Sequence, residues 1–274
     1  MLPCGVDATR VDGRTRAPRS VLLLAILTVL VATIGLAVSV GRSLEPGTAS
    51  AGPLITLRPT STTSTTKPKP KYQVPPVTWL ATPKGQISTF DAPGGKQIGT
   101  AGFWYGYSMT MPIIQSTSQW VRIRLPERPN GGTAWVMKAQ VKISSTPYRV
   151  VIRRGSTKVR LYKDGFPYWE MPAGLGKSAT PTPLGSYFVA VIEQPGPHGY
   201  GPVVLDTSAH SEAIQSWQGS GDAIIALHGP ISASSDRAIG TTGTYISNGC
   251  IRLHSSDQNQ LFAIPLGTPV DIVP

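Results

Sequence analysis

A run of twenty uncharged and mostly apolar residues, VLLLAILTVLVATIGLAVSV, occupies positions 21–40. As a helix rising about 1.5 Å per residue it would reach about 30 Å, the thickness of a bilayer core. Four arginines precede the run and only Arg42 follows it closely, which favours residues 1–20 in the cytoplasm and the remainder outside. We therefore predict a single-pass anchor in the cell membrane. The alternative is a cleaved signal peptide with a small-residue site at Ala49-Ser50-Ala51, although such peptides usually have a shorter apolar region.

Beyond the apolar run the pattern changes twice. Residues 41–75 are rich in Ser, Thr and Pro with few apolar side chains to bury, which predicts an extended tether. From residue 76 short alternating runs stand between turn residues, such as Trp120–Leu125 and, after Gly131-Gly132, Thr133–Met137. Alternation with this spacing predicts a small β-barrel or sandwich over residues 76–147.

Residues 148–274 also predict a β fold, so we assign the whole exported part to the mainly β class. Two runs meet at a hairpin-like turn, and a short helix is expected where Asp257 or a neighbouring serine can cap it. Residues 194–221, rich in Gly, Pro and Ser, are interpreted as a flap over a site. The expected strands are Tyr148–Arg153, Lys158–Tyr162, Ser186–Ile192, Ala223–Leu227 and Pro269–Val273.

The net charge of +11 matters only through its location. Residues 149–274 carry nine basic and nine acidic side chains, so the excess lies wholly upstream. Nucleic-acid binding would require a basic stripe on one folded element, and none is present. A basic linker and first domain suit an anionic membrane or wall surface instead.

The chain has two cysteines, Cys4 and Cys250, on opposite sides of the apolar run, so a bridge between them within one chain is implausible. Cys250 stands in Ser247-Asn248-Gly249-Cys250-Ile251-Arg252, seventeen residues after Leu227-His228-Gly229. A thiol attacks carbonyls as thiolate, and a nearby histidine can accept its proton near neutral pH. The preceding glycine permits a tight turn with exposed N–H groups. On these residues alone, a buried inert cysteine remains the alternative.

The full string resembles the catalytic domain of L,D-transpeptidases of the YkuD type, whose signature is His-Gly, a loop, then Ser-His-Gly-Cys-(Ile/Val)-Arg or Asn. Upstream, Gly174-Leu-Gly-Lys177 and Thr182-Pro-Leu-Gly185 are similar to that family's entry to a central strand, and Gly199-Tyr-Gly-Pro202 and Leu266-Gly-Thr-Pro-Val270 also fit. The resemblance covers residues 148–274 and implies a β-sandwich-like catalytic domain there. Asn248 departs from the family pattern, which most often has histidine there.

The resemblance implies that Cys250 attacks the meso-diaminopimelate–D-alanine bond of a peptidoglycan stem and that His228 transfers the proton. A second stem would resolve the thioester and give a 3→3 cross-link, without metal or cofactor. The Gly249 and Cys250 N–H groups would hold the oxyanion, and the Gly229 carbonyl would orient the imidazole. Ser247, Asn248 and Arg252 are expected to contact substrate or to shape the loop.

Other polar residues receive simpler interpretations. Each of Asp206, Asp222 and Asp236 could be a third triad member, but loop or capping roles are favoured. His198, His210 and His254 do not have metal-ligand spacing, and packing or surface roles are expected for them.

The first β region, with WVRIRL and GTAWVM, resembles bacterial SH3-like wall-targeting domains, although an inert β spacer is the alternative. Two competing functions remain for the whole chain. A sortase shares the order anchor, β domain, His, Cys and Arg, but has Thr-Leu-x-Thr-Cys in place of the present string. A non-catalytic wall-binding protein would not need both a nucleophile and a base.

Overall fold

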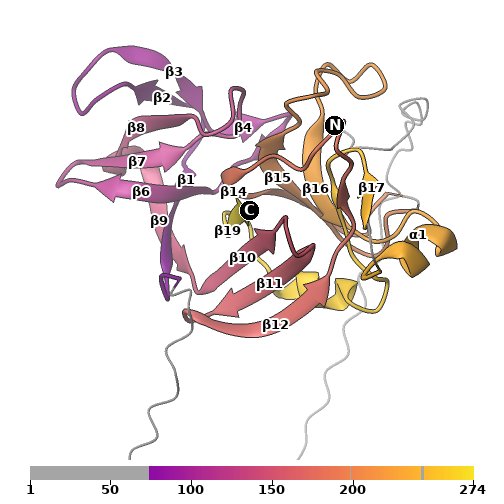
Figure 1. The fold of residues 1–274 in the computed structure, drawn as a ribbon. Helices are drawn as coiled ribbons and strands as arrows, with labels where there is room; N and C mark the ends of the chain where they lie inside the picture. The colour runs from indigo at the N-terminus through magenta and orange to yellow at the C-terminus, as the bar shows by residue number, and fades with distance from the viewer. Residues whose placement is uncertain (1–73, 198, 242–243) are drawn as a thin grey trace, which may run out of the picture. The chain divides into compact units, whose positions relative to one another are not determined.

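The computed structural model describes residues 74–197, 199–241 and 244–274, which all belong to one compact unit (Figure 1). The predicted anchor at 21–40 and the tether lie outside the described residues. Among the residues that are described, no helix has the length and apolar character needed to cross a membrane.

The first part of the described chain forms an antiparallel sheet in the order β3-β2-β8-β7-β6-β1-β9, with a small hairpin, β4-β5, beside it. Its strands are β1 (Thr78–Pro83), β2 (Ile87–Phe90), β3 (Gln97–Ala101), β4 (Phe103–Trp104), β5 (Tyr107–Ser108), β6 (Met111–Ser116), β7 (Trp120–Arg124), β8 (Thr133–Met137) and β9 (Val141–Thr146), with the 3-10 turn η1 (Lys138–Gln140) before β9.

The second part forms a mixed sheet in the order β12-β11-β10-β19-β14-β15-β16-β18, in which β10-β19 and β16-β18 are parallel. A separate pair, β13-β17, lies beside it. The elements are β10 (Tyr148–Arg153), β11 (Lys158–Lys163), β12 (Phe166–Pro172), β13 (Leu175–Gly176), β14 (Gly185–Glu193), β15 (Val204–His210), β16 (Ile224–His228), α1 (Ala233–Ala238), β17 (Tyr245–Ser247), β18 (Ile251–Arg252), η2 (Gln258–Ala263) and β19 (Pro269–Val273).

Strand β14 explains how the two sheets are joined. Its apolar run Tyr187–Val191 is continuous rather than alternating, as expected of a strand buried on both faces. Tyr187 and Val189 enter the core of the second sheet, whereas Phe188 and Ala190 pack with the first sheet. The two sheets therefore share a hydrophobic core through this strand.

The five strands expected in residues 148–274 are all present, with shifts of at most one residue at their ends. The helix expected after Asp257 is the 3-10 element η2, and Asp257 makes no side-chain capping bond there. The helix α1 was not predicted; the Ser232 hydroxyl accepts a hydrogen bond from the Ser235 N–H at its start.

The interpretation of residues 194–221 as one flap is wrong for residues 204–210. Residues 204–210 form β15, a strand buried at every position and paired with both β14 and β16. An antiparallel β region is present before residue 147, as expected, while its assignment to the SH3-like class stays a prediction.

Candidate active site

His228 and Cys250 lie on the same face of the second sheet. Strands β16 and β18 run parallel with Leu227 opposite Ile251, and both of those side chains enter the main core. Because successive side chains alternate between faces, His228 and Cys250 project to the other side. The sequence places them 22 residues apart, and the parallel pairing brings them together.

The His228 ring is completely buried, and a backbone carbonyl fixes its orientation. Its Nδ1 lies 2.6 Å from the carbonyl oxygen of Gly229. Because that oxygen can only accept, Nδ1 carries the proton and a neutral ring keeps Nε2 as its basic atom. Nε2 has no hydrogen-bond partner among the described residues, and the ring of Tyr200 lies 4.5 Å away between centroids.

Cys250 is 1% exposed and packs in a small cluster with Tyr200, Val204, Ala223 and Ala226. Its Sγ lies 3.8 Å from the Ile224 carbonyl oxygen. Ile214 and Trp217, from the segment between β15 and β16, pack against the same cluster. The thiol is therefore buried in a cluster against which this segment packs.

Gly249 allows the chain to turn into Cys250. Its φ of +127° is in a region that side chains rarely adopt, and an added Cβ would lie 2.7 Å from Cδ1 of Ile225. The Gly249 N–H donates to Ser247 Oγ at 3.1 Å, and Ser247 Oγ donates to the Cys250 carbonyl at 2.6 Å. Ser247 is buried with both of these bonds inside the loop, which favours loop shaping over substrate contact for this residue.

Thr182 supports the same loop from the upstream motif. Its Oγ1 accepts from the Gly176 N–H and donates to the Gly249 carbonyl at 2.8 Å. The Thr182-Pro-Leu-Gly185 motif was noticed in the sequence, but nothing there indicated that its hydroxyl reaches the cysteine loop.

Two of the three candidate aspartates pair with histidines other than His228. Asp236 pairs with His254 Nδ1 at 2.5 Å, and Asp222 pairs with His210 at 2.8 Å. Asp206 is buried on the same face of β15 as Val204, which contacts the Cys250 cluster. Burial raises the pKa of Asp206 well above its usual value, and nearby Glu193 and Cys250 add to this rise.

Asn248 and Arg252 are partly exposed beside the loop. One guanidinium nitrogen of Arg252 donates to Ser235 Oγ at 3.2 Å, so Arg252 links the cysteine strand to helix α1. A pocket of about 730 Å³ is lined by Lys177 and Tyr245 among others, and the Lys177 N–H bonds the Ser247 carbonyl. The described residues contain no group of three or more His, Cys, Asp or Glu side chains that could hold a metal.

Two residues support the histidine in ways that the sequence analysis did not predict. Tyr200, which stands in the Gly199-Tyr-Gly-Pro202 motif, has its ring tilted against that of His228, and its carbonyl accepts from both the Gly229 N–H and the amide of Gln258. Gln258 is 1% exposed and lies where a Cβ on Gly229 would stand, at 2.5 Å. No local motif marks Gln258, because its partners are more than fifty residues away.

Comparisons with known proteins identify the family of the second part of the chain. Residues 147–272 match the L,D-transpeptidase catalytic domain family (YkuD). A Bacillus licheniformis protein named as the L,D-transpeptidase YkuD is 34% identical over 130 residues, covering 47% of this chain and 67% of that protein.

Solved structures give the same kind of match at lower similarity. An L,D-transpeptidase from Mycobacterium smegmatis is 16% identical, with a TM-score of 0.36, over 57% of this chain and 91% of its own. The catalytic domain of the E. faecium L,D-transpeptidase is 23% identical, with a TM-score of 0.32, over 46% and 95%.

The chain belongs to the L,D-transpeptidase family of peptidoglycan cross-linking enzymes, which act on the cell wall outside the cytoplasm.

Proposed function

We propose that Cys250 is the nucleophile of this L,D-transpeptidase and that His228 is its general base and acid. The observation that carries the assignment is the pairing of β16 with β18, which sets both side chains on one face while the Gly229 carbonyl fixes the His228 tautomer. That carbonyl replaces the carboxylate of a conventional triad, since it orients the ring without adding charge.

The proposed reaction has two acyl-transfer steps. His228 Nε2 takes the thiol proton, and the Cys250 thiolate attacks the carbonyl of the meso-diaminopimelate–D-alanine bond in a donor stem. The C–N bond breaks as His228 returns the proton to the leaving D-alanine amine, and a thioester remains. The side-chain amine of an acceptor stem then attacks the thioester, the C–S bond breaks, and the released proton returns through His228 to the thiol. The product is a 3→3 cross-link.

The oxyanion donor proposed for these steps is the Cys250 N–H. Gly249 can contribute its own N–H only by releasing Ser247 Oγ, to which it donates in this structure. Preorganised donors of this kind are usually worth about 10²–10³-fold in rate. Ser247 and Thr182 are therefore proposed to hold the loop in which the Cys250 N–H is presented.

Substrate binding is proposed to involve partly exposed groups around the loop, namely Asn248 and Arg252, together with Lys177 in the neighbouring pocket. Because Cys250 is 1% exposed, the segment with Ile214 and Trp217 must shift before a stem can reach the thiol.

Acylation by a carbapenem tests the nucleophile, because its strained lactam carbonyl stands in for the scissile amide. Intact-protein mass spectrometry should show one added drug mass on the wild type and none on Cys250→Ser. His228→Ala should slow acylation by about 10²–10⁴-fold, whereas Asn248→His should change it little. Labelling that persists in Cys250→Ser would move the nucleophile elsewhere. Wild-type acylation of His228→Ala would remove the proposed base.

The cellular placement is also part of the proposal. Residues 21–40 are proposed to anchor the protein in the membrane, with the tether 41–75 and an SH3-like region over 76–147 outside it. The full-length protein should then sediment with membranes and retain its N-terminal residues. Mature N-termini near Gly52 would show a cleaved signal peptide instead.

A further inference from the structure

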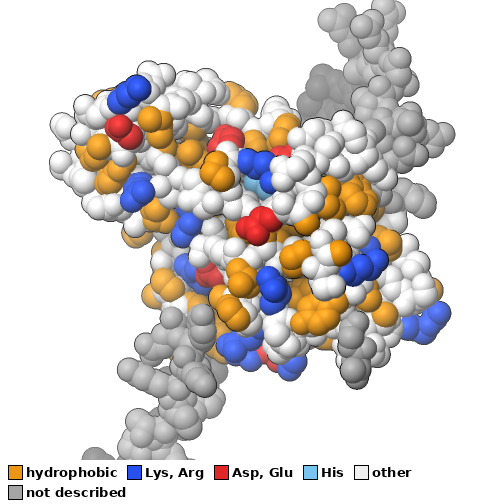
Figure 2. Space-filling model, turned by 45° about the horizontal axis from the view of Figure 1, so that its top comes forward, with side chains coloured by type: hydrophobic (Ala, Val, Ile, Leu, Met, Phe, Trp, Pro, Cys, Tyr) orange, Lys and Arg blue, Asp and Glu red, His pale blue; other side chains and the backbone are white. Residues whose placement is uncertain are grey.

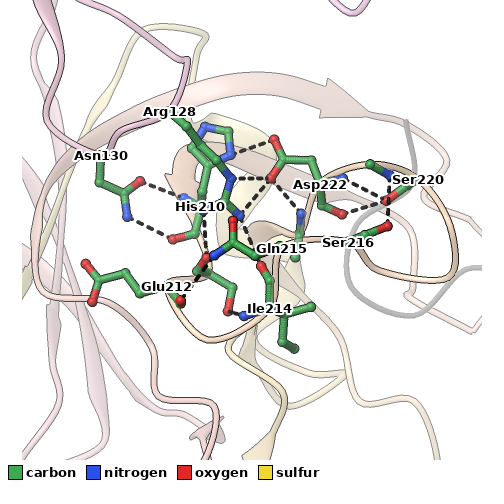
Figure 3. Close-up of polar contacts among 12 residues, drawn as sticks. Arg128, Asn130, His210, Glu212, Ile214, Gln215, Ser216, Ser220 and Asp222 are labelled. Carbon is green, nitrogen blue, oxygen red and sulfur yellow. Dashed lines mark hydrogen bonds and ion pairs between the residues drawn. The ribbon is translucent and has the colours of Figure 1, made fainter.

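The turn between β7 and β8, in the first sheet, reaches across to the segment 211–222 of the second. Arg128 in this turn contacts that segment with all three guanidinium nitrogens. Nη1 donates to the Ser211 carbonyl at 2.9 Å and Nη2 to the Ile214 carbonyl at 3.1 Å. Nε donates to Asp222 Oδ1 at 2.9 Å, so one side chain binds both ends of the segment (Figure 3).

A second residue of the same turn fixes where the segment begins. The Asn130 amide donates to the His210 carbonyl at 2.8 Å and its oxygen accepts from the His210 N–H at 2.9 Å, a two-way pairing with the end of β15. The His210 ring is 1% exposed, and its two nitrogens face the Pro126 carbonyl at 2.5 Å and Asp222 Oδ2 at 2.8 Å. Figure 2 shows side chains of both charges and a histidine gathered near the middle of one face.

Asp222 joins these contacts into one cluster. Its Oδ2 also accepts from the Tyr105 hydroxyl at 3.1 Å, and its Oδ1 accepts from the Ala223 N–H at 2.7 Å. Its backbone carbonyl accepts from the Trp217 N–H at 2.8 Å. The carboxylate that binds Arg128 thus belongs to the residue that holds Trp217 in place.

The segment packs against the cluster that contains the thiol. Ile214 and Trp217 are its partly buried side chains, and both pack against the cluster of which Cys250 is a member. Arg128 binds the Ile214 carbonyl, so its guanidinium holds a residue that contacts this cluster.

We propose that Arg128 and Asn130 are positioning residues for the transpeptidase reaction, which draw segment 211–222 back toward its closed position once it has opened and a stem has entered beside Cys250. The inference rests on the proposed role of Cys250. It makes the first β region a working part of the site, in addition to any role in wall targeting. The alternative is that the same contacts only join the two sheets, in which case they affect stability alone.

Two probes of Cys250 separate these roles. Iodoacetamide needs only access to the sulfur, so loosening the segment should speed its reaction. Carbapenem acylation needs an enclosed and oriented carbonyl, so the same change should slow it. Iodoacetamide also labels Cys250 in unfolded molecules, so each variant is compared with wild type brought by urea to the same free energy of unfolding. A variant that is merely less stable would then show the same ratio of rates as that wild-type reference.

The experiment compares Arg128→Ala, Arg128→Lys and Asn130→Ala in the full-length protein. The control is Arg122→Ala, which removes an arginine bonded to Thr133 within the first sheet. We expect Arg128→Ala to raise the ratio of the iodoacetamide rate to the carbapenem rate by about tenfold or more. The same variant should speed hydrogen exchange in 211–222 more than in β14. Arg128→Lys should remain impaired, because a single ammonium cannot copy the guanidinium fork. Asn130→Ala should shift the ratio in the same direction by about threefold or more. If Arg128→Ala does not fold, the result for Asn130→Ala decides between the two roles. Arg122→Ala should behave as wild type.

Faster exchange in 211–222 with an unchanged rate ratio in Arg128→Ala and Asn130→Ala would overturn the inference. An equal shift in Arg122→Ala would do the same, because it would show a general effect of the first sheet. A wild-type protein that carbapenem does not acylate, or that is still labelled after Cys250→Ser, would instead overturn the proposed nucleophile. The two failures are therefore distinguishable.

Discussion

Thr182 Oγ1 donates a hydrogen bond of 2.8 Å to the carbonyl oxygen of Gly249, a residue 67 positions further along the chain. Thr182 Oγ1 also accepts a hydrogen bond from the Gly176 N–H, so one buried hydroxyl joins the β13 segment to the turn before Cys250. This hydroxyl therefore fixes the position of the Gly249 carbonyl, directly before the cysteine.

Thr182→Val removes that hydroxyl while keeping the shape of the side chain. Two buried backbone groups then lose a partner, which typically costs about 1–3 kcal/mol for each group. We expect a lower thermal midpoint and carbapenem acylation slowed by about tenfold or more. Thr207→Val is the matched control, since Thr207 Oγ1 also donates to a carbonyl and accepts from an N–H, within β15 and β16. Equal acylation rates in the two variants would show that the Thr182 bond is structural only.

Gly229→Ala should disturb the base without touching its ring. The added Cβ would stand 2.5 Å from the Gln258 amide oxygen, and Gln258 is too buried to move freely. Overpacking of this kind costs about 1–3 kcal/mol, and displacing the Gly229 carbonyl would release Nδ1 of His228. Slower acylation is expected at all pH values, measured by stopped-flow absorbance. Gly155→Ala, where a Cβ meets only ordinary contacts, should leave the rate unchanged.

Asp206 gives a pH dependence of stability with a definite sign. Burial raises its pKa in the folded protein, with contributions from Glu193 and Cys250. The folded state therefore binds more protons than the unfolded state once pH exceeds the usual aspartate value, and stability falls as pH rises from there. Asp206→Asn should remove this decline and raise the thermal midpoint at pH 8 more than at pH 5. Asp91→Asn, at an exposed site, is the control. A parallel shift at both pH values would contradict the assignment.

Asp222 predicts the opposite sign. Burial alone would raise its pKa, but hydrogen bonds from His210, the Ala223 N–H and Arg128 outweigh burial and hold the pKa below its usual value. The stabilisation is present above the unfolded pKa and is lost as pH falls through the folded one. Urea titrations between pH 2 and pH 6 should show Asp222→Asn differing most from wild type at the upper end of this range and least at the lower end. A constant difference would mean that the carboxylate charge is not involved.

The sequence predicted what local patterns can encode. Alternation located β7, β8, β10 and β11, and the string around Cys250 indicated the family and the thiol chemistry. It did not predict β15, because the Gly, Pro and Ser residues around Val204–His210 favoured a loop. A strand flanked by such residues forms here because β14 and β16 pair with it on both sides.

The contacts among charged residues could not be predicted from the sequence for a different reason. Arg128 and Asp222 are 94 positions apart, and neither stands in a motif. His210 was given a packing or surface role, and its burial against Asp222 arises only when the two sheets meet. The tautomer of His228, in contrast, follows from its neighbour in the chain and was foreseen through Gly229.

Strand β14 also determines which truncated fragments of this protein can fold stably. Because Phe188 and Ala190 face the first sheet, a fragment beginning at residue 148 would expose these side chains, with Ile224, to water. At about 25 cal/mol for each Å² of apolar surface, even a modest exposed patch is a large share of a domain's net stability. The unit that we expect to unfold in a single calorimetric transition therefore includes the first sheet and is longer than the matched family segment, 147–272. Heat should melt residues 74–274 as one cooperative body, and a shortened enzyme would be prone to self-association through the uncovered face of β14.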